Sequence, residues 1–217
     1  MQRIFARYKK YLGDKAFLFS STFGALLLLI SLIINHYASA YATNNASGSV
    51  EDIILSNTRV FNVDFVVNEG AFLFLVFVAI LLFLEPKRIA FTLKASALFI
   101  LIRSIFITLT HLAPFPTHAI LDQSDIFAIF NFGGDFFFSG HTGLPFLIAL
   151  IFWDEKPIRY TAIGVSLLFG TSVLLGHLHY SIDVFSAFFI TYSIFHLALR
   201  LFAKDYKVLY EIDENVR

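Results

Sequence analysis

Cysteine is absent from the 217-residue sequence, and its absence excludes several kinds of site. Without thiols the chain can form no disulfide, bind no metal through thiolates and use no cysteine nucleophile. Net charge is absent as well, because 16 Lys and Arg residues balance 16 Asp and Glu residues. A neutral chain gives no electrostatic reason to expect a nucleic-acid partner, so we expect none. The distribution of the charges is more informative than their sum.

Hydrophobic residues make up 58% of the sequence and include 28 phenylalanines, and the mean hydropathy is +0.75. A soluble domain is nearer half apolar and does not concentrate its apolar residues in runs of about twenty. We therefore expect an all-α, polytopic membrane protein. Since the chain shows no internal repeat or low-complexity tract, we expect residues 1–217 to form a single integral membrane domain.

The apolar runs predict six membrane-spanning helices. The expected spans cover residues 16–37, 70–84, 89–112, 140–153, 158–176 and 180–203, with polar loops at 38–68 and 113–134. Ala38-Ser39-Ala40 resembles a signal-peptidase site, but the apolar run before it is longer than the usual signal-peptide core. We therefore expect the first helix to be retained.

Lysine and arginine gather on one side of these spans. If the N-terminus is cytoplasmic, 14 of the 16 basic residues lie on the inner side, and the exceptions are Arg59 in an outer loop and Arg103 within a span. This distribution follows the positive-inside rule. We therefore expect both termini in the cytoplasm, and segments 113–143 and 177–183 on the exoplasmic side.

Two polar clusters open apolar runs on that side. His179 and Asp183 are four residues apart, so they share one face of a helix, and the carboxylate can orient the imidazole. His141 begins another helix, whose free N–H groups favour an anion such as phosphate. Arg103 is expected about 12 Å below the outer end of its span, where a charge should face the bundle interior. The pattern favours catalysis at a membrane surface.

These residues allow other interpretations. Arg103 could form a purely structural ion pair with Asp135 or Asp183. A proton-coupled transporter also uses ionisable residues, but spreads them through the membrane depth rather than at one edge. A metal site at His177 and His179 is not expected, because residues two apart do not face each other on a helix. The remaining histidines are expected to be interfacial or structural: His36, His111, His118 and His196.

The order of these motifs resembles a known family. Ser139-Gly140-His141 followed by His179-x-x-x-Asp183 is similar to the type 2 phosphatidic acid phosphatase superfamily, which has a six-helix membrane fold. The sphingomyelin synthase branch is the more similar one, over about residues 95–200. Three stretches carry that similarity: Arg103-Ser104-Ile105 through Pro114-Phe115-Pro116, Gly134-Asp135-Phe136-Phe137-Phe138-Ser139-Gly140-His141-Thr142, and His177-Leu178-His179-Tyr180-Ser181-Ile182-Asp183-Val184.

The resemblance implies a mechanism. His179 would be the nucleophile that takes the phosphoryl group, Asp183 would orient it, and His141 would protonate the leaving alkoxide and then deprotonate the incoming hydroxyl. The donor would be a phospholipid such as phosphatidylcholine or phosphatidylethanolamine, and the acceptor ceramide or a diacylglycerol-like alcohol. No metal or other cofactor is implied. The candidate substrate-binding and phosphate-binding residues are Arg103, Asp135, Ser139, Gly140 and Tyr180.

The chain also departs from the family pattern. Where the phosphatases typically have a Ser-Arg pair this sequence has Ser172-Val173, and Lys94 has the wrong spacing for their lysine. A phosphomonoester dianion calls for several cations, whereas one deep arginine suits a diester with a single negative charge. This favours a headgroup transferase over a phosphatase, the alternative if water is the acceptor. Leu178, however, stands where the synthases have Asp, so donor and acceptor stay open.

Overall fold

The computed structural model describes residues 2–119 and 136–210, with side chains from residue 8 onward. These residues form helices and short 3₁₀ turns without a strand, which confirms the predicted all-α fold. The elements are α1 (Gln2–Gly13), α2 (Lys15–Asn44), η1 (Leu55–Asn57), α3 (Asp64–Val67), α4 (Glu69–Leu84), η2 (Pro86–Arg88), α5 (Ile89–Leu109), α6 (Gly140–Ile151), α7 (Lys156–Leu175), α8 (Ser181–Leu201) and α9 (Ala203–Leu209).

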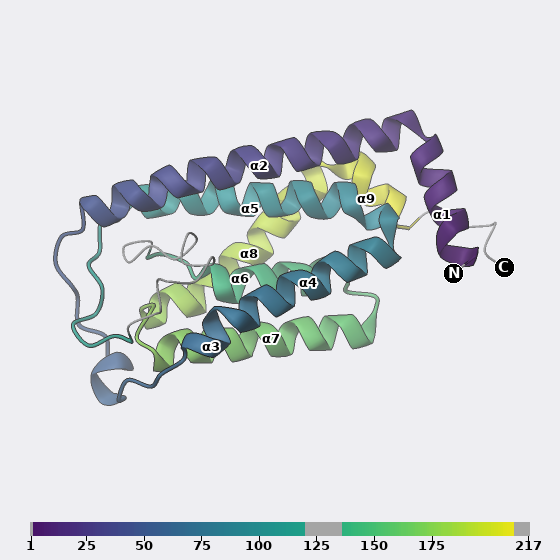
Figure 1. Ribbon diagram of the computed structural model, residues 1–217. Coiled ribbons are helices and arrows are strands. Elements are labelled where there is room, and N and C mark those ends of the chain that lie inside the picture. Colours follow the sequence, from purple (N-terminus) through teal and green to yellow (C-terminus); the bar gives the residue numbers. More distant parts are fainter. Residues whose placement is uncertain (1, 120–135, 211–217) are drawn as a thin grey trace.

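Five segments of the described chain are long and apolar enough to cross a membrane. They are α2, α3 with α4, η2 with α5, α7 and α8, which lie alongside one another in Figure 1. The fourth expected span is α6, a shorter apolar helix of 12 residues. At 1.5 Å per residue it is roughly 18 Å long, against roughly 30 Å of bilayer hydrocarbon. The polytopic helical architecture is thus confirmed, with α6 beginning inside the bundle.

The first span is longer than its apolar run. Helix α2 starts after Asp14, whose carboxylate accepts a hydrogen bond from the Ala16 N–H (2.8 Å), and continues through Ala38-Ser39-Ala40 to Asn44. It packs along α5 (Figure 1). Small residues recur every seven positions on its buried face, at Gly24, Ser31 and Ala38. Small side chains let two helix backbones approach closely, as in other membrane helix pairs.

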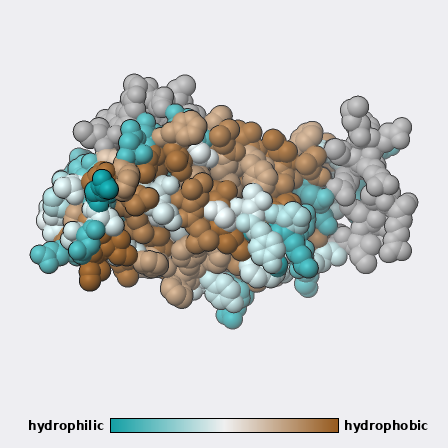
Figure 2. Space-filling model, turned by 90° about the horizontal axis from the view of Figure 1, so that it is seen from below, coloured by the Kyte–Doolittle hydropathy of each residue, from teal (hydrophilic) through white to brown (hydrophobic). Residues whose placement is uncertain are grey.

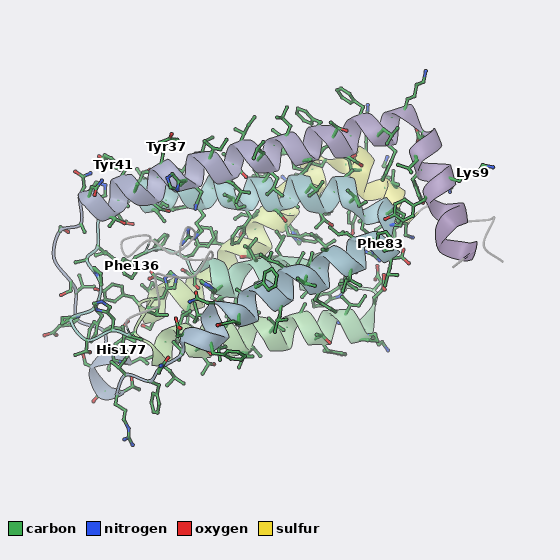
Figure 3. All side chains as sticks on the ribbon, viewed as in Figure 1. Lys9, Tyr37, Tyr41, Phe83, Phe136 and His177 are labelled. Carbon is green, nitrogen blue, oxygen red and sulfur yellow. The ribbon has the colours of Figure 1, made fainter. Side chains whose placement is uncertain are left out.

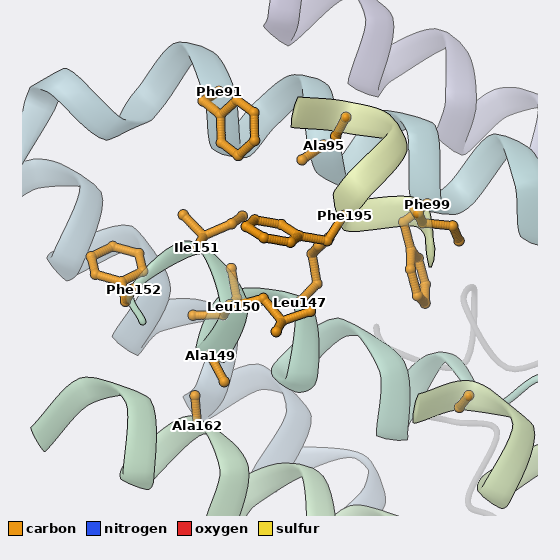
Figure 4. Packing of buried hydrophobic residues seen from close by; sticks show 14 of the residues in the cluster. Phe91, Ala95, Phe99, Leu147, Ala149, Leu150, Ile151, Phe152, Ala162 and Phe195 are labelled. Carbon is orange, nitrogen blue, oxygen red and sulfur yellow. The ribbon is translucent and has the colours of Figure 1, made fainter. Parts of the chain in front are cut away.

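The central core joins α5, α6, α7 and α8. Figure 4 shows Phe91 and Phe99 of α5 and Phe195 of α8 around the apolar residues of α6, with Ala162 of α7 on the other side of that helix. Leu147 of α6 is fully buried there. Close packing of this kind resists displacement. The core therefore fixes the start of α6, and with it the segment that carries His141.

The outside of the helices is hydrophobic. Large apolar side chains stand exposed along the spans, among them Phe19 of α2, Leu73 of α4 and Phe189 of α8. Figure 2 shows hydrophobic side chains over most of the middle of one face, with hydrophilic ones mainly toward its ends. Exposed apolar surface of this extent is costly in water but favourable against lipid tails. The surface agrees with a multi-pass membrane protein.

Candidate active site

The segment before α6 is a tight turn tied to the start of α8. The backbone N–H of Ser139 donates to the Asp183 carbonyl (3.0 Å), and the Ser139 hydroxyl accepts from the Thr142 N–H (3.3 Å), which caps α6. Phe137 in this turn has a φ of 79°. A bulky residue adopts this left-handed conformation only when its surroundings impose it, and such residues gather at functional sites. The two motif-bearing segments are thus one structural unit.

His141 lies in the first turn of α6 and is held by its neighbours. Its ring lies near the backbone of Val67 and within electrostatic range of His179 and Arg103. The ring of Phe169 on α7 packs edge-on against it, with the ring centroids 6.2 Å apart. The structure therefore places a second imidazole and a guanidinium within electrostatic range of His141.

His179 and Asp183 form the pair that their spacing predicts. The Nδ1 atom of His179 is 3.3 Å from Oδ2 of Asp183, and both side chains are buried. The same Oδ2 accepts from the backbone N–H of Tyr180 (3.0 Å), so the carboxylate also caps α8. A hydrogen bond to one nitrogen of an imidazole ring leaves the other nitrogen for a different partner. In His179 the nitrogen that does not face Asp183 is Nε2.

Arg103 lies beside the start of α6. Its Nε donates to the Phe138 carbonyl (3.2 Å), and one terminal nitrogen reaches the Asn35 side-chain oxygen on α2 (3.4 Å). A Cβ atom built on Gly140 would lie 3.5 Å from Nε of Arg103, so the guanidinium lies beside the helix N-terminus. Arg103 is six residues from the end of α5, roughly 9 Å along the helix. The expected inward-facing arginine is thus present.

The loop after α2 anchors the start of α8. Asp52 accepts hydrogen bonds from the backbone N–H groups of Ser181 (2.7 Å), Ile54 (2.9 Å) and Leu55 (3.1 Å). Burial opposes ionisation of this carboxyl, but these hydrogen bonds outweigh it and hold the pKa of Asp52 below its ordinary value. The Tyr180 hydroxyl donates to the Ala113 carbonyl (2.8 Å). His179 is therefore followed directly by two anchored residues, Tyr180 and Ser181.

His177 packs against the same outer loops. It is buried, and its ring contacts the Thr58 hydroxyl (3.2 Å) and the Thr117 carbonyl (2.8 Å). Its φ of 52° turns the chain toward α8. Figure 3 shows His177 and Phe136 at the same end of the bundle, far from Lys9 and Phe83. Across residues 2–119 and 136–210 no cluster of three or more His, Cys, Asp or Glu side chains could hold a metal ion.

The structure brings together most of the residues singled out from the sequence. His141 lies within electrostatic range of His179 and Arg103. Ser139 and Gly140 begin the helix that carries His141, and Gly140 lies beside the Arg103 guanidinium. Asp183 orients His179, while Asp135 lies outside the described residues. Tyr180 is buried, with its hydroxyl committed to the outer loops.

Two polar contributors were missed by sequence reasoning. Asn35 contacts both Arg103 and Ser104, and its position inside an apolar run was a usable signal. The sequence offered no such signal for Asp52, because no local pattern relates a loop aspartate to a helix 129 residues later.

The fold and this site describe a multi-pass helical membrane protein with two histidines, an aspartate and an arginine at one end of the bundle. Residues 133–200 match a family described as PAP2 superfamily C-terminal. Members of that superfamily are phosphatases and phosphotransferases, so the match supports an enzyme that acts on phosphoesters. The matched range includes His141, His179 and Asp183.

One curated protein is also similar in sequence, but its name states no function. This chain is 33% identical over 69 residues to an uncharacterized protein of Methanocaldococcus jannaschii. The aligned stretch is 32% of this chain and 29% of that protein, so the chain spans less than a third of the relative's length. No solved structure matches the chain.

Proposed function

We propose that this protein is a membrane lipid phosphotransferase, similar to the sphingomyelin synthases, that moves a phospho-headgroup from a phospholipid to a lipid alcohol. The observation that carries the proposal is the convergence of His141, the His179–Asp183 pair and Arg103 at the start of α6. Two imidazoles divide the work of nucleophile and proton carrier, and a guanidinium is suited to a phosphate oxygen. No cofactor is needed for this chemistry.

In the first step, Nε2 of His179 attacks the phosphorus of the donor. A P–N bond forms, and the bond from phosphorus to the diacylglycerol oxygen breaks. His141 gives its proton to that oxygen, so diacylglycerol leaves as a neutral alcohol. Asp183 stabilises the positive charge that develops on the His179 ring, because its carboxylate is 3.3 Å from Nδ1.

In the second step, the hydroxyl of ceramide or a similar alcohol takes the place of diacylglycerol. His141 accepts the hydroxyl proton as the oxygen attacks phosphorus, and the P–N bond to His179 breaks. The enzyme returns to its starting protonation state. Arg103 and the backbone N–H groups of Gly140 and His141 at the start of α6 neutralise the charge on the phosphate oxygens in both steps.

The arrangement of the cations supports a diester substrate. Lys94 lies nine residues before Arg103 on the same helix, roughly 14 Å away along its axis. Its ammonium forms an ion pair with Asp205 (2.7 Å), so its charge is paired away from the candidate active site. Arg103 is thus the cation that the described residues bring to His141, which matches one negative charge better than a dianion.

A groove beside the site supports a lipid substrate. It has a volume of about 340 Å³ and lies between α5 and α8, where Ile102, Phe106, Phe189 and Leu197 line it. Ile102 precedes Arg103 directly, and Phe106 packs against Phe138 of the turn before α6. An acyl chain in this groove would put its headgroup near the two histidines.

A lipid phosphate phosphatase is the second candidate, because the superfamily match covers both activities. Liposome reconstitution separates the two. We would incubate the protein with labelled phosphatidylcholine and phosphatidylethanolamine, with and without ceramide, and identify the lipid products. Headgroup transfer to ceramide, lost in His141→Ala and His179→Ala, is the expected result. Release of free phosphate from phosphatidic acid, without transfer to any alcohol, would identify a phosphatase.

His196→Ala is the matched control for the two active-site variants. His196 is an exposed histidine on α8 whose neighbours are the aromatic rings of Tyr192 and Phe195. The proposal expects this variant to keep the wild-type product pattern. Full turnover in His179→Ala would contradict both candidate functions, since each needs this nucleophile.

A further inference from the structure

A second hollow lies at the other end of the bundle, where α2, α5 and the junction of α8 and α9 meet (Figure 1). It has a volume of about 490 Å³. We name it the basal pocket. Three basic side chains line it, Lys94, Arg200 and Lys204, together with one carboxylate, Asp205. Three cations against one anion leave the lining with a charge of +2, so the basal pocket favours an anionic ligand.

The floor of the basal pocket is a buried polar cluster. The Lys94 ammonium donates to the Ser20 hydroxyl (2.6 Å) and to Oδ2 of Asp205 (2.7 Å), and the Ser20 hydroxyl donates to Oδ1 of the same carboxylate. Lys94 therefore neutralises Asp205, and both carboxylate oxygens are occupied. An ammonium has three N–H donors, and the described residues supply acceptors for two. One charged donor remains for a ligand.

The rim combines charge with apolar surface. Arg200 and Lys204 are exposed, and they stand four residues apart across the break at Phe202 between α8 and α9. The rings of Phe23 and Phe202 flank the Lys94 ammonium, with centroids 5.6 and 5.7 Å from it. A ligand here would meet two exposed cations and two aromatic faces, which suits a phosphate attached to an apolar body.

The depth of the basal pocket matches a lipid headgroup. Ser20 and Lys94 each lie five residues into their helices, roughly 8 Å from the helix start. Arg200 is next to the last residue of α8. The pocket is therefore located at the ends of three candidate membrane spans, where phospholipid phosphates lie beside the hydrocarbon.

We propose that the basal pocket binds the phosphate of an anionic phospholipid, distinct from the lipid that reacts at the other end of the molecule. Arg200 and Lys204 would contact the phosphate oxygens, and the remaining N–H of Lys94 would donate from the floor. The acyl chains would lie against Phe23 on the lipid-facing side of α2, where this ring is exposed. Free inorganic phosphate shares the charge but would gain nothing from the aromatic rim.

Native mass spectrometry of the full chain tests this proposal. All proteins would carry His179→Ala, so that the proposed catalytic nucleophile cannot consume the probe. The probes are phosphatidylglycerol and phosphatidylcholine. We expect preferential binding of phosphatidylglycerol and a loss of affinity on the order of twentyfold in Arg200→Gln/Lys204→Gln, since each interfacial cation contributes about fivefold. Lys207→Gln is the control, because Lys207 is exposed on the same short helix but does not line the pocket.

Three other outcomes of this experiment would each overturn the proposal. Equal loss in Lys207→Gln would mean that diffuse surface charge attracts the lipid. Unchanged affinity in the double variant, with helix content preserved, would mean that the basal pocket does not bind it. Displacement of phosphatidylglycerol by inorganic phosphate at equal concentration would identify a site for the free anion rather than for a lipid.

Discussion

The imidazole of His179 has different surroundings at its two nitrogens. Nδ1 faces the buried Asp183 carboxylate, and the Phe136 ring packs edge-on against the imidazole with centroids 6.0 Å apart. These contacts hold the ring and leave Nε2 facing away from Asp183, and under the proposed function Nε2 is the atom that attacks phosphorus. The second carboxylate oxygen, Oδ1 of Asp183, is buried without a hydrogen-bond partner in the described part of the chain. Asp183 is therefore well placed to respond when the imidazole becomes cationic.

Asp183→Asn should reduce turnover while leaving the fold intact. The amide oxygen can still accept from the Tyr180 N–H, but a neutral side chain cannot stabilise the His179 cation. We expect the rate of product formation to fall on the order of 10³-fold or more, as for other neutralised orienting carboxylates. Product formation in liposomes and thermal unfolding in detergent would be measured together.

Asp154→Asn is the matched control, since Asp154 is an exposed carboxylate in the turn before α7. It should keep wild-type turnover. If Asp183→Asn also kept full turnover, Asp183 would be only a helix cap, and its proposed role toward His179 would be wrong.

At the scale of elements, the site depends on how closely α6 packs between its neighbours. Gly143 is the fourth residue of α6, and a Cβ there would come within 2.7 Å of the Phe99 ring on α5 and 2.8 Å of the Thr191 hydroxyl on α8. Gly164 on α7 has no atom within 4 Å of such a Cβ. The two helical glycines therefore differ sharply in packing, which makes them a useful pair.

Gly143→Ala should destabilise the protein by about 1–3 kcal/mol, the usual cost of forcing a methyl group into a packed core. Gly164→Ala should stabilise it by up to about 1 kcal/mol, because alanine favours a helix interior over glycine. Thermal unfolding in one detergent would measure both. Equal effects in the two variants would show that α6 is not tightly seated against α5 and α8.

The loop that anchors α8 should make stability depend on pH. The pKa of Asp52 is below its ordinary value, so its contribution is fully present above that value, 3.8, and is lost as the pH falls through the lower folded-state pKa. Acidification should therefore destabilise the wild type more than Asp52→Asn. Glu51→Gln, which alters the exposed neighbouring carboxylate, should follow the wild type. Identical acid profiles for all three proteins would exclude a role for Asp52.

For the whole molecule, the sequence predicted what local spacing and hydropathy determine. The four-residue spacing predicted the His179–Asp183 pair, although His179 lies in the bend before α8 rather than on a shared helix face, and Arg103 follows from its position in an apolar run. The extension of α2 to Asn44 was missed because hydropathy ends earlier, whereas alanines such as Ala40 and Ala42 continue a helix. The contact of Asp52 with Ser181 depends on long-range packing, which no local pattern encodes.

The predicted orientation can be tested because the chain has no cysteine of its own. Ser56→Cys puts one exposed thiol in the loop after α2, and Lys156→Cys puts one at the exposed start of α7. A membrane-impermeant maleimide applied to intact cells should label the first thiol and not the second, since the positive-inside distribution places them on opposite sides. Labelling of Lys156→Cys alone would reverse the topology and move the candidate site to the cytoplasmic face.

Capture of a phosphorylated histidine tests the central claim most directly. The protein would be reconstituted with a phospholipid labelled at its headgroup phosphate, quenched before acceptor is added, and digested for mass spectrometry. We predict an acid-labile label on His179, absent from His179→Ala and discharged when lipid alcohol is added. Headgroup transfer that proceeds without any labelled histidine, and persists in His179→Ala, would contradict the account.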